Sequence, residues 1–497
     1  MGFFEQVVAT LQFDYLLVMT GAVFLGIVMG ILPGLGGSIT LALLIPVTFS
    51  LSPEMAMVIL LSAYPAAGFG GCITSILINT PGTAENSVTT LDGFPLAKKG
   101  KARFAISAAL FSSAMGGIIG LIVLVLLIPV ARKLVLAFSY PEFFMLAIFG
   151  LTVIAIVTKG NSFRGVISAL VGLMLAFVGT DPIISTTRFT FGTDYLWDGI
   201  GLIPVIIGLF ALTEAFSMFE KKSAIANEKF TLEPGGTLDG IKAVFKHYWL
   251  FLRSCMIGVF IGIVPGVGGS VASFMAYGTA VNSSKNPEKF GKGAIEGIVA
   301  AEGANDAKDG GALLPTLAFG IPGSTGMAVL MGGLLMHGLV PGPKMLTEDL
   351  EMTNFLLAVT FVSKFITYAV AMIIGVRLVF ITKIRGSLMA PGVVAISLVG
   401  AYAMRGSLGD VIVAVVFGLI GLWMKKYGYS AVALIIALVL GGLVEQTYHQ
   451  TMTSFGASGF FTRPITFVLF LMTLFSLFWP VVKRKLDERK SKGGLSA

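Results

Sequence analysis

Long apolar segments recur along this 497-residue chain, from Leu16 to Val482, and they limit its possible folds more than any other feature. Segments of about 17 to 25 apolar residues are long enough to cross a lipid bilayer as α-helices. They lack the regular alternation of polar and apolar residues that strands of a membrane β-barrel show. Only 12% of the residues are charged, which is about half the fraction of a soluble protein. The sequence therefore predicts an all-α polytopic membrane protein.

Hydropathy divides the predicted spans into two groups on either side of a polar stretch. The first group covers residues 15–32, 39–50, 54–79, 104–130, 142–158, 165–180 and 199–219. The second group covers residues 249–264, 270–281, 293–320, 324–340, 354–381, 389–402, 409–424, 429–443 and 464–482. Several segments are too short to cross a bilayer alone, so we expect half-helices or hairpin arms among them and about 12 full crossings.

An internal repeat marks equivalent places in the two groups. Gly26–Ser38 (GIVMGILPGLGGS) returns 232 positions later as Gly258–Ser270 (GVFIGIVPGVGGS), with eight of 13 residues identical. Each copy runs from an apolar helix into a Pro-Gly-x-Gly-Gly-Ser break. A second pair of breaks lies downstream, at Asn79–Asn86 and Gly320–Thr325. Glycine- or proline-interrupted segments at matching places in two halves point to the substrate site of a transporter.

The chemistry of these breaks favours an anion. Proline removes a helical donor and glycine frees the backbone, and a helix that begins after the break directs free N–H groups and its positive dipole end towards it. Serine and threonine hydroxyls add donors, so the breaks together predict a neutral cradle for an anion. Carbonyls at the preceding helix ends suit Na⁺. Tight helix packing or kinking is the alternative interpretation. The predicted substrate-binding residues are Gly34, Gly36, Gly37, Ser38, Asn79, Thr80, Pro81, Gly82, Thr83, Gly266, Gly268, Gly269, Ser270, Pro322, Gly323, Ser324 and Thr325.

The most polar internal stretch is Glu302–Asp309. Charge at membrane depth is costly and usually functional, so Glu302, Asn305 and Asp306 are the candidates for coupling to an ion. A solvated helix face, or a structural ion pair of Lys308, would explain the same residues. Lys364 lies inside a long apolar span, where it could bind an anion, act as a coupling cation, form an ion pair or snorkel to the surface. The sequence predicts no cofactor and no metal beyond possible Na⁺ at the breaks.

Lysine and arginine residues predict the orientation, because they favour the cytoplasmic side of a membrane. With the C-terminus cytoplasmic and the N-terminus outside, 26 basic residues face the cytoplasm, and Lys308 and Lys364 are not assigned to a side. The six that face outward are Arg132, Lys133, Arg188, Lys344, Arg405 and Arg463. In that orientation the two halves are inverted repeats. The predicted organisation is a first membrane repeat (1–219), a cytoplasmic linker (220–248), a second membrane repeat (249–443), and an extra spanning helix with a basic cytoplasmic tail (444–497).

Other functions receive less support from the sequence. It contains no HExxH, GxSxG or Walker A motif, which argues against a metalloprotease, a serine hydrolase or an ATP-driven pump. The net charge of +8 follows from the uneven distribution of basic loops and does not predict nucleic-acid binding. A channel could use the same breaks as an ion filter. A membrane enzyme would need a catalytic pair such as Asp306 with Lys308.

Long motifs of the chain resemble the large membrane subunit of the tripartite tricarboxylate transporters. They include GILPGLGGS, GIVPGVGGS, SILINTPGTAENSVTTLDGFPLAKKGKA and AAEGANDAKDGGALLPTLAFGIPGSTGMAVLMGGLLMHGLVPGP. The resemblance implies a multi-pass secondary transporter of the bacterial inner membrane that imports di- and tricarboxylates such as citrate, coupled to Na⁺ or H⁺. It also implies two partners, a small four-span membrane subunit and a periplasmic solute-binding protein.

Overall fold

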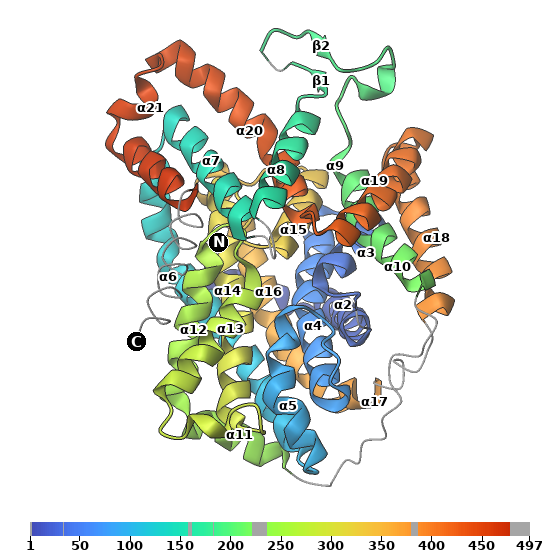
Figure 1. Ribbon diagram of the computed structural model, residues 1–497, viewed down its shortest axis with the longest axis vertical. Helices are drawn as coiled ribbons and strands as arrows, with labels where there is room; N and C mark the ends of the chain where they lie inside the picture. Colours follow the sequence, from blue (N-terminus) through green and yellow to red (C-terminus); the bar gives the residue numbers. More distant parts are fainter. Residues whose placement is uncertain are drawn as a thin grey trace, which may run out of the picture. The chain divides into compact units, whose positions relative to one another are not determined.

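A computed structural model describes residues 2–32, 34–157, 162–181, 183–220, 236–378 and 386–477. These residues are helical almost throughout, and among them only one short pair of strands occurs (Figure 1). The prediction of an all-α polytopic membrane protein is confirmed. Most of the predicted linker, 221–235, and the basic tail after residue 477 lie outside the described residues.

The chain forms two compact units, each built from two stretches of sequence. Unit 1 comprises residues 1–132 and 206–422, and unit 2 comprises residues 133–205 and 423–497. The elements of the first stretch of unit 1 are α1 (Phe3–Thr10), α2 (Phe13–Ile31), α3 (Gly37–Thr48), α4 (Pro53–Ile78), η1 (Glu85–Ser87), α5 (Thr89–Lys98) and α6 (Ala102–Ala137), whose last turn belongs to unit 2.

The second stretch of unit 1 carries the other set of broken helices. Its elements are η3 (Ile207–Leu212), α10 (Thr213–Glu220), α11 (Thr237–Lys246), α12 (Tyr248–Ile263), α13 (Gly268–Ser283), η4 (Pro287–Lys289), α14 (Ile295–Phe319), α15 (Thr325–Met336), η5 (Pro343–Leu346), α16 (Leu350–Val370), η6 (Ala371–Gly375), α17 (Val376–Leu378), α18 (Gly386–Arg405) and α19 (Leu408–Tyr427). Unit 2 contains α7 (Tyr140–Val157), α8 (Ser162–Ala176), β1 (Gly179–Thr180), β2 (Thr187–Arg188), η2 (Asp194–Leu196), α9 (Leu202–Ile206), α20 (Ala431–Phe455), α21 (Gly459–Thr462) and a final apolar helix, Pro464–Leu477.

Eight helices among the described residues are long and apolar enough to cross a membrane, and a ninth if α11 and α12 count as one bent span. Five shorter apolar helices accompany them, including α3 and α15, which are the half-helices expected after the breaks. The total number of crossings depends on how many of the short helices combine into full spans. The expected number of about 12 crossings therefore stays a prediction. The inverted orientation of the two repeats stays a prediction as well.

Glycines bring each broken helix into backbone contact with the long helix beside it. α2 packs along α4, and α12 packs along α14. A Cβ atom added at Gly30 of α2 would lie 1.9 Å from the carbonyl oxygen of Ala67. One added at Gly262 of α12 would lie 2.2 Å from the carbonyl oxygen of Lys308. Small residues permit such close approach of helices in a membrane, and the two halves use them at matching positions.

The second break of each half folds back onto the first helix pair in the same way. A Cβ atom at Gly82 would lie 1.9 Å from the carbonyl oxygen of Gly30, and one at Gly323 would lie 2.7 Å from the carbonyl oxygen of Gly262. The 232-residue repeat therefore extends beyond the sequence motif to the packing around it.

Two predicted helix ends differ clearly from the structure: α6 continues to Ala137, past the predicted end at residue 130, and α20 in unit 2 continues further still. The sequence placed the end of a span at residue 443, where hydropathy falls, but α20 continues to Phe455. Glu445 explains the difference, because Arg188 donates to its two carboxylate oxygens over 2.6 and 3.1 Å. Arg188 also lies 3.0 Å from Asp181. The backbone amides of Ile183 and Ile184, and then Arg188, lower the pKa of the Asp181 carboxyl group below its usual value.

We expect Gly30→Ala to lower the unfolding temperature of the purified protein, because its Cβ atom would overlap the Ala67 carbonyl group and overpacking of this kind costs about 1–3 kcal/mol. Gly21→Ala is the matched control, since it changes the same helix at a position with no atom within 4 Å. Alanine is the better helix former there by up to about 1 kcal/mol. Equal effects of the two substitutions in a thermal-unfolding measurement would contradict this account.

Candidate functional site

Tyr64 of α4 joins a break of the first half to a break of the second. Its ring lies where a Cβ atom at Gly37 would be, 2.8 Å from the nearest ring carbon, and also where one at Gly326 would be, at 2.2 Å. Gly37 opens α3 and Gly326 lies in the first turn of α15. The beginnings of two half-helices from opposite halves of the sequence therefore both pack against one aromatic ring.

The other breaks connect to the same group. Gly36 packs on the side chain of Thr83, at 3.2 Å from a built Cβ atom to Cγ2. The N–H of Gly266 donates to the carbonyl oxygen of Gly323 over 3.1 Å. Gly269, at the beginning of α13, packs directly against the side chains of Lys308 and Glu85.

All four predicted breaks thus form one connected region of unit 1, which we call the junction. We define it by the N-terminal turns of α3, α13 and α15, the segment 79–86, Tyr64 and Lys308.

The backbone at the junction follows from its glycines. Gly34, Gly266 and Gly268 have φ of +95°, +73° and +73°, a region that residues with a Cβ atom rarely enter. Asn79 ends α4 with φ of +52°, and Gly320 ends α14 in the corresponding left-handed conformation. These residues stop the long helices at equivalent points, so the chain can turn into the junction.

The predicted hydroxyl donors fall into two kinds. The Ser324 oxygen accepts from the N–H of Met327 and so caps α15, and the Thr83 hydroxyl donates to Asn86 over 2.6 Å. Ser38 and Ser270 are half-buried, and neither hydroxyl bonds to another described residue. Ser38 and Ser270 are therefore available to a ligand, whereas Ser324 and Thr83 already hold local structure.

The remaining predicted residues complete the segments around these groups. Thr80 donates its hydroxyl to the carbonyl oxygen of Ile78. Pro322 and Gly323 are buried, while Pro81 and Thr325 are half-buried. All five residues are uncharged, so the electrostatics of the junction depend on other side chains.

Lys308 supplies the positive charge that the sequence analysis did not place at the breaks. Its side chain is 2% exposed, and its Nζ lies 2.9 Å from Glu85 Oε1 and 3.0 Å from Asp309 Oδ1. Glu85, on η1, is 27% exposed, so the outer end of this pair is open. The Lys308 Nζ also lies 5.8 Å from the centre of the Tyr64 ring. The expected neutral cradle is thus lined by a buried ammonium group.

Asp306 and Lys364 form the deeper part of the same charge network. The Lys364 Nζ lies 3.1 Å from Asp306 Oδ1 and 3.8 Å from Asp309 Oδ2, with the lysine side chain fully buried. Of the interpretations open for Lys364, the ion pair is the one observed, and snorkelling is wrong. A solvated face for Glu302–Asp309 is also wrong, since the charged side chains of this stretch are buried.

Glu302 is held differently, by neutral donors. Its carboxylate accepts from the hydroxyl of Thr89, from Asn86 over 3.3 Å and from Ser113 over 2.8 Å. Two acceptors nearby are left over among the described residues: Asn305 Oδ1 and Asp306 Oδ2 are buried without a hydrogen-bond partner. Buried oxygens without donors are costly, and these two are suited to a cation or, at the carboxylate, a proton.

Sequence reasoning found the breaks and the polar stretch but missed Tyr64, Ser113 and the role of Glu85. Tyr64 lies in an apolar helix where nothing in the local pattern distinguishes it. Ser113 lies in a similar apolar helix. Glu85 did stand in a predicted break, but its partner Lys308 comes from the other half of the chain.

Comparison with known proteins agrees with this architecture. Residues 16–436 match the tripartite tricarboxylate transporter TctA family. The chain belongs to this family. It is therefore a subunit of a tripartite tricarboxylate transporter, in a family that works with a small membrane subunit and a periplasmic binding protein.

Two relatives come from Agrobacterium vitis, and both are uncharacterized. A 52.8 kDa protein in the TAR-I ttuC′ 3′ region is 31% identical over 457 residues, which cover 89% of this chain and 88% of the relative. A protein in the TAR-II ttuC′ 3′ region is 30% identical over 237 residues, which cover 46% of this chain and 98% of the relative. No solved structure matches the chain.

We expect Lys364→Met to destabilise the transporter subunit by about 3–5 kcal/mol, because it leaves Asp306 without its buried cation. The double variant Lys364→Met with Asp306→Asn should recover part of this loss, since it also removes the uncompensated carboxylate. Lys344→Met is the control: its pair with Glu348 is 70% and 72% exposed, and such pairs contribute about 1 kcal/mol or less. Thermal unfolding in detergent measures all three, and an unchanged midpoint for Lys364→Met would exclude a structural role for the pair.

Proposed function

We propose that this subunit imports di- or tricarboxylates such as citrate across the bacterial inner membrane, by cation-coupled alternating access. A periplasmic solute-binding protein delivers the substrate, and a small four-span subunit completes the membrane complex. The N-terminus is periplasmic and the C-terminus cytoplasmic, so that the two halves of the chain form inverted repeats.

The observation that carries this proposal is the convergence of four helix breaks on the buried ammonium group of Lys308. Three half-helices direct their N-terminal turns into the junction, where free N–H groups and the helix dipoles favour an anion. Discontinuous helices bind anionic substrates in this way in other secondary transporters. Ser38 and Ser270 add hydroxyl donors that no described residue uses.

Glu85 is the group that an entering substrate displaces in this proposal. Its carboxylate lies on Lys308 and is the partly exposed member of that pair. A substrate carboxylate has the same chemistry and can replace it, because the exchange keeps a negative charge beside the buried ammonium group. In this scheme Glu85 is an internal counter-ion that leaves when substrate binds and returns when substrate is released.

The coupling ion binds deeper, at the oxygens of Asn305 and Asp306 that lack hydrogen-bond partners. Oxygen ligands are those that hard cations such as Na⁺ prefer, and a proton on the carboxylate would serve the same purpose. Because Asp309 contacts both Lys308 and Lys364, a change of charge at Asp306 alters the field at the substrate position. Glu302 is a second proton acceptor candidate within the same helix.

Transport is tested in proteoliposomes that contain the membrane complex together with its binding protein. We expect counterflow of radiolabelled citrate or a related di- or tricarboxylate, and net uptake driven by an inward Na⁺ or H⁺ gradient. Uptake that ignores every imposed ion gradient would refute the coupling. Flux far above transporter rates, without counterflow, would indicate a channel instead.

Substitution of hydroxyl residues separates substrate binding from packing. We expect Ser38→Ala and Ser270→Ala to raise the half-saturating substrate concentration about three- to tenfold, which is the loss of one hydrogen bond of 0.5–1.5 kcal/mol, with unchanged membrane abundance. Ser324→Ala should lower abundance as well, because that hydroxyl caps α15. Thr20→Val is the control, since its hydroxyl bonds only within α2. Equal loss of abundance and affinity in the Ser38 and Ser270 variants would support tight packing as the role of these breaks.

A further inference from the structure

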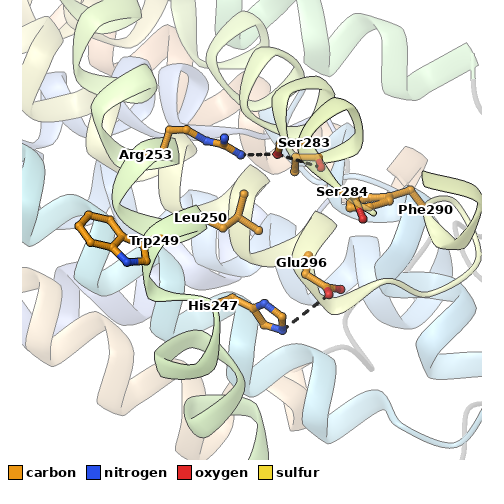
Figure 2. Close-up of a pocket in the computed structure, with 9 residues that line it drawn as sticks. His247, Trp249, Leu250, Arg253, Ser283, Ser284, Phe290 and Glu296 are labelled. Carbon is orange, nitrogen blue, oxygen red and sulfur yellow. Dashed lines mark hydrogen bonds and ion pairs between the residues drawn. The ribbon is translucent and has the colours of Figure 1, made fainter. Parts of the chain in front are cut away.

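A cavity of about 470 Å³ lies away from the junction, beside the bend between α11 and α12. It is bounded by the first turns of α12, the end of α13 and the beginning of α14 (Figure 2). Leu250 points into its centre, and Arg253 spans one side to reach Ser283 (Figure 2). The transport scheme above uses none of these residues.

Arg253 is a cation without an anionic partner. Its Nη2 donates to the hydroxyl oxygen of Ser283 over 2.6 Å, and among the described residues no carboxylate lies within ion-pair distance of it. The neighbouring side chains on the same helix, Leu252 and Met256, are exposed and apolar, so this face of α12 points towards lipid. A charge in such a place is costly unless an anion from outside the chain accompanies it.

The position along α12 places the cavity at the level of lipid headgroups. α11 and α12 meet at an angle of 79°, and the exposed aromatic rings of Tyr248 and Trp249 lie directly after the bend. Such aromatic residues gather at membrane–water interfaces. Arg253 lies one helical turn beyond Trp249, on the membrane side of this level. The predicted orientation assigns it to the cytoplasmic leaflet, which carries the anionic lipids.

The acid in the cavity does not cancel this charge. Glu296 forms an ion pair with Lys289 at 2.6 Å. It also lies 3.7 Å from His247, and Figure 2 draws this second pair. Arg253 therefore lines the open volume without an anionic partner, and the Ser284 hydroxyl, whose oxygen accepts from the N–H of Asn286 over 3.2 Å, can still donate there. A guanidinium group binds phosphate through two parallel hydrogen bonds, and the apolar side chains of Leu250 and Phe290 suit the glycerol and upper acyl region beside it.

We propose that this cavity binds the headgroup of an anionic phospholipid, with its phosphate on Arg253. The proposal is independent of the transport function, because the residues involved lie outside the junction and the charge network.

The test is lipid binding to the purified, delipidated full-length protein, measured by native mass spectrometry with added phosphatidylglycerol. We expect one tight site in the wild type, with at least tenfold weaker binding in Arg253→Gln and intermediate binding in Arg253→Lys, which keeps the charge but loses the fork. Arg132→Gln, an exposed arginine on α6 that does not line the cavity, should retain the site. Unfolding temperatures verify that the variants are folded.

Other outcomes would overturn the proposal. Equal binding by Arg253→Gln and wild type would show that the lipid does not use this cavity. Equal affinity for phosphatidylcholine would remove the requirement for an anionic lipid. Displacement of phosphatidylglycerol by millimolar inorganic phosphate, or by citrate, would identify the cavity as a site for a free anion. If Arg253→Gln fails to fold, Arg253→Lys provides the test. Wild-type affinity in the lysine variant would refute a pair of parallel hydrogen bonds from the guanidinium group to phosphate.

Discussion

The close approach of each broken helix to the long helix beside it is the contact on which the rest of unit 1 depends. Non-helical backbone at membrane depth survives only where protein surrounds it or water reaches it. Gly30 and Gly262 let the carbonyl oxygens of the neighbouring helices come within contact distance, and Gly82 and Gly323 return to the same places. A larger residue at these positions would overlap the neighbouring backbone and push the breaks away from their partners.

Charge in this region is buried except at one end. Glu85 is partly exposed, whereas the side chains of Lys308, Asp309, Asp306 and Lys364 are all buried. Buried ion pairs rarely add stability relative to apolar side chains of the same size. In the transport mechanism that we propose, these ion pairs serve to exchange partners when substrate binds and leaves. Glu302 differs from these carboxylates, because neutral donors hold it and no ion pair involves it among the described residues.

Local sequence features predicted much of the fold. The helix ends follow from hydropathy and from glycine or proline at the breaks, because both act over a single turn of chain. The prediction failed at α20, where a half-buried arginine from a distant hairpin pairs with Glu445 and the helix continues past it. It also overlooked α5, whose first residue, Thr89, supports Glu302. In both cases the missing information was a partner far away in sequence.

By itself, the sequence determined that this protein is an all-α membrane protein with four breaks in two matched pairs, since these properties belong to residue types and their spacing. Only the tertiary structure decided which breaks meet. Tyr64 packs against both Gly37 and Gly326, and Asn86 reaches Glu302 across 216 positions of sequence. Spacing along the chain cannot encode such pairs, because they depend on how separate helices pack. The same packing brings the buried ammonium group of Lys308 to the breaks, where the sequence predicted a neutral cradle.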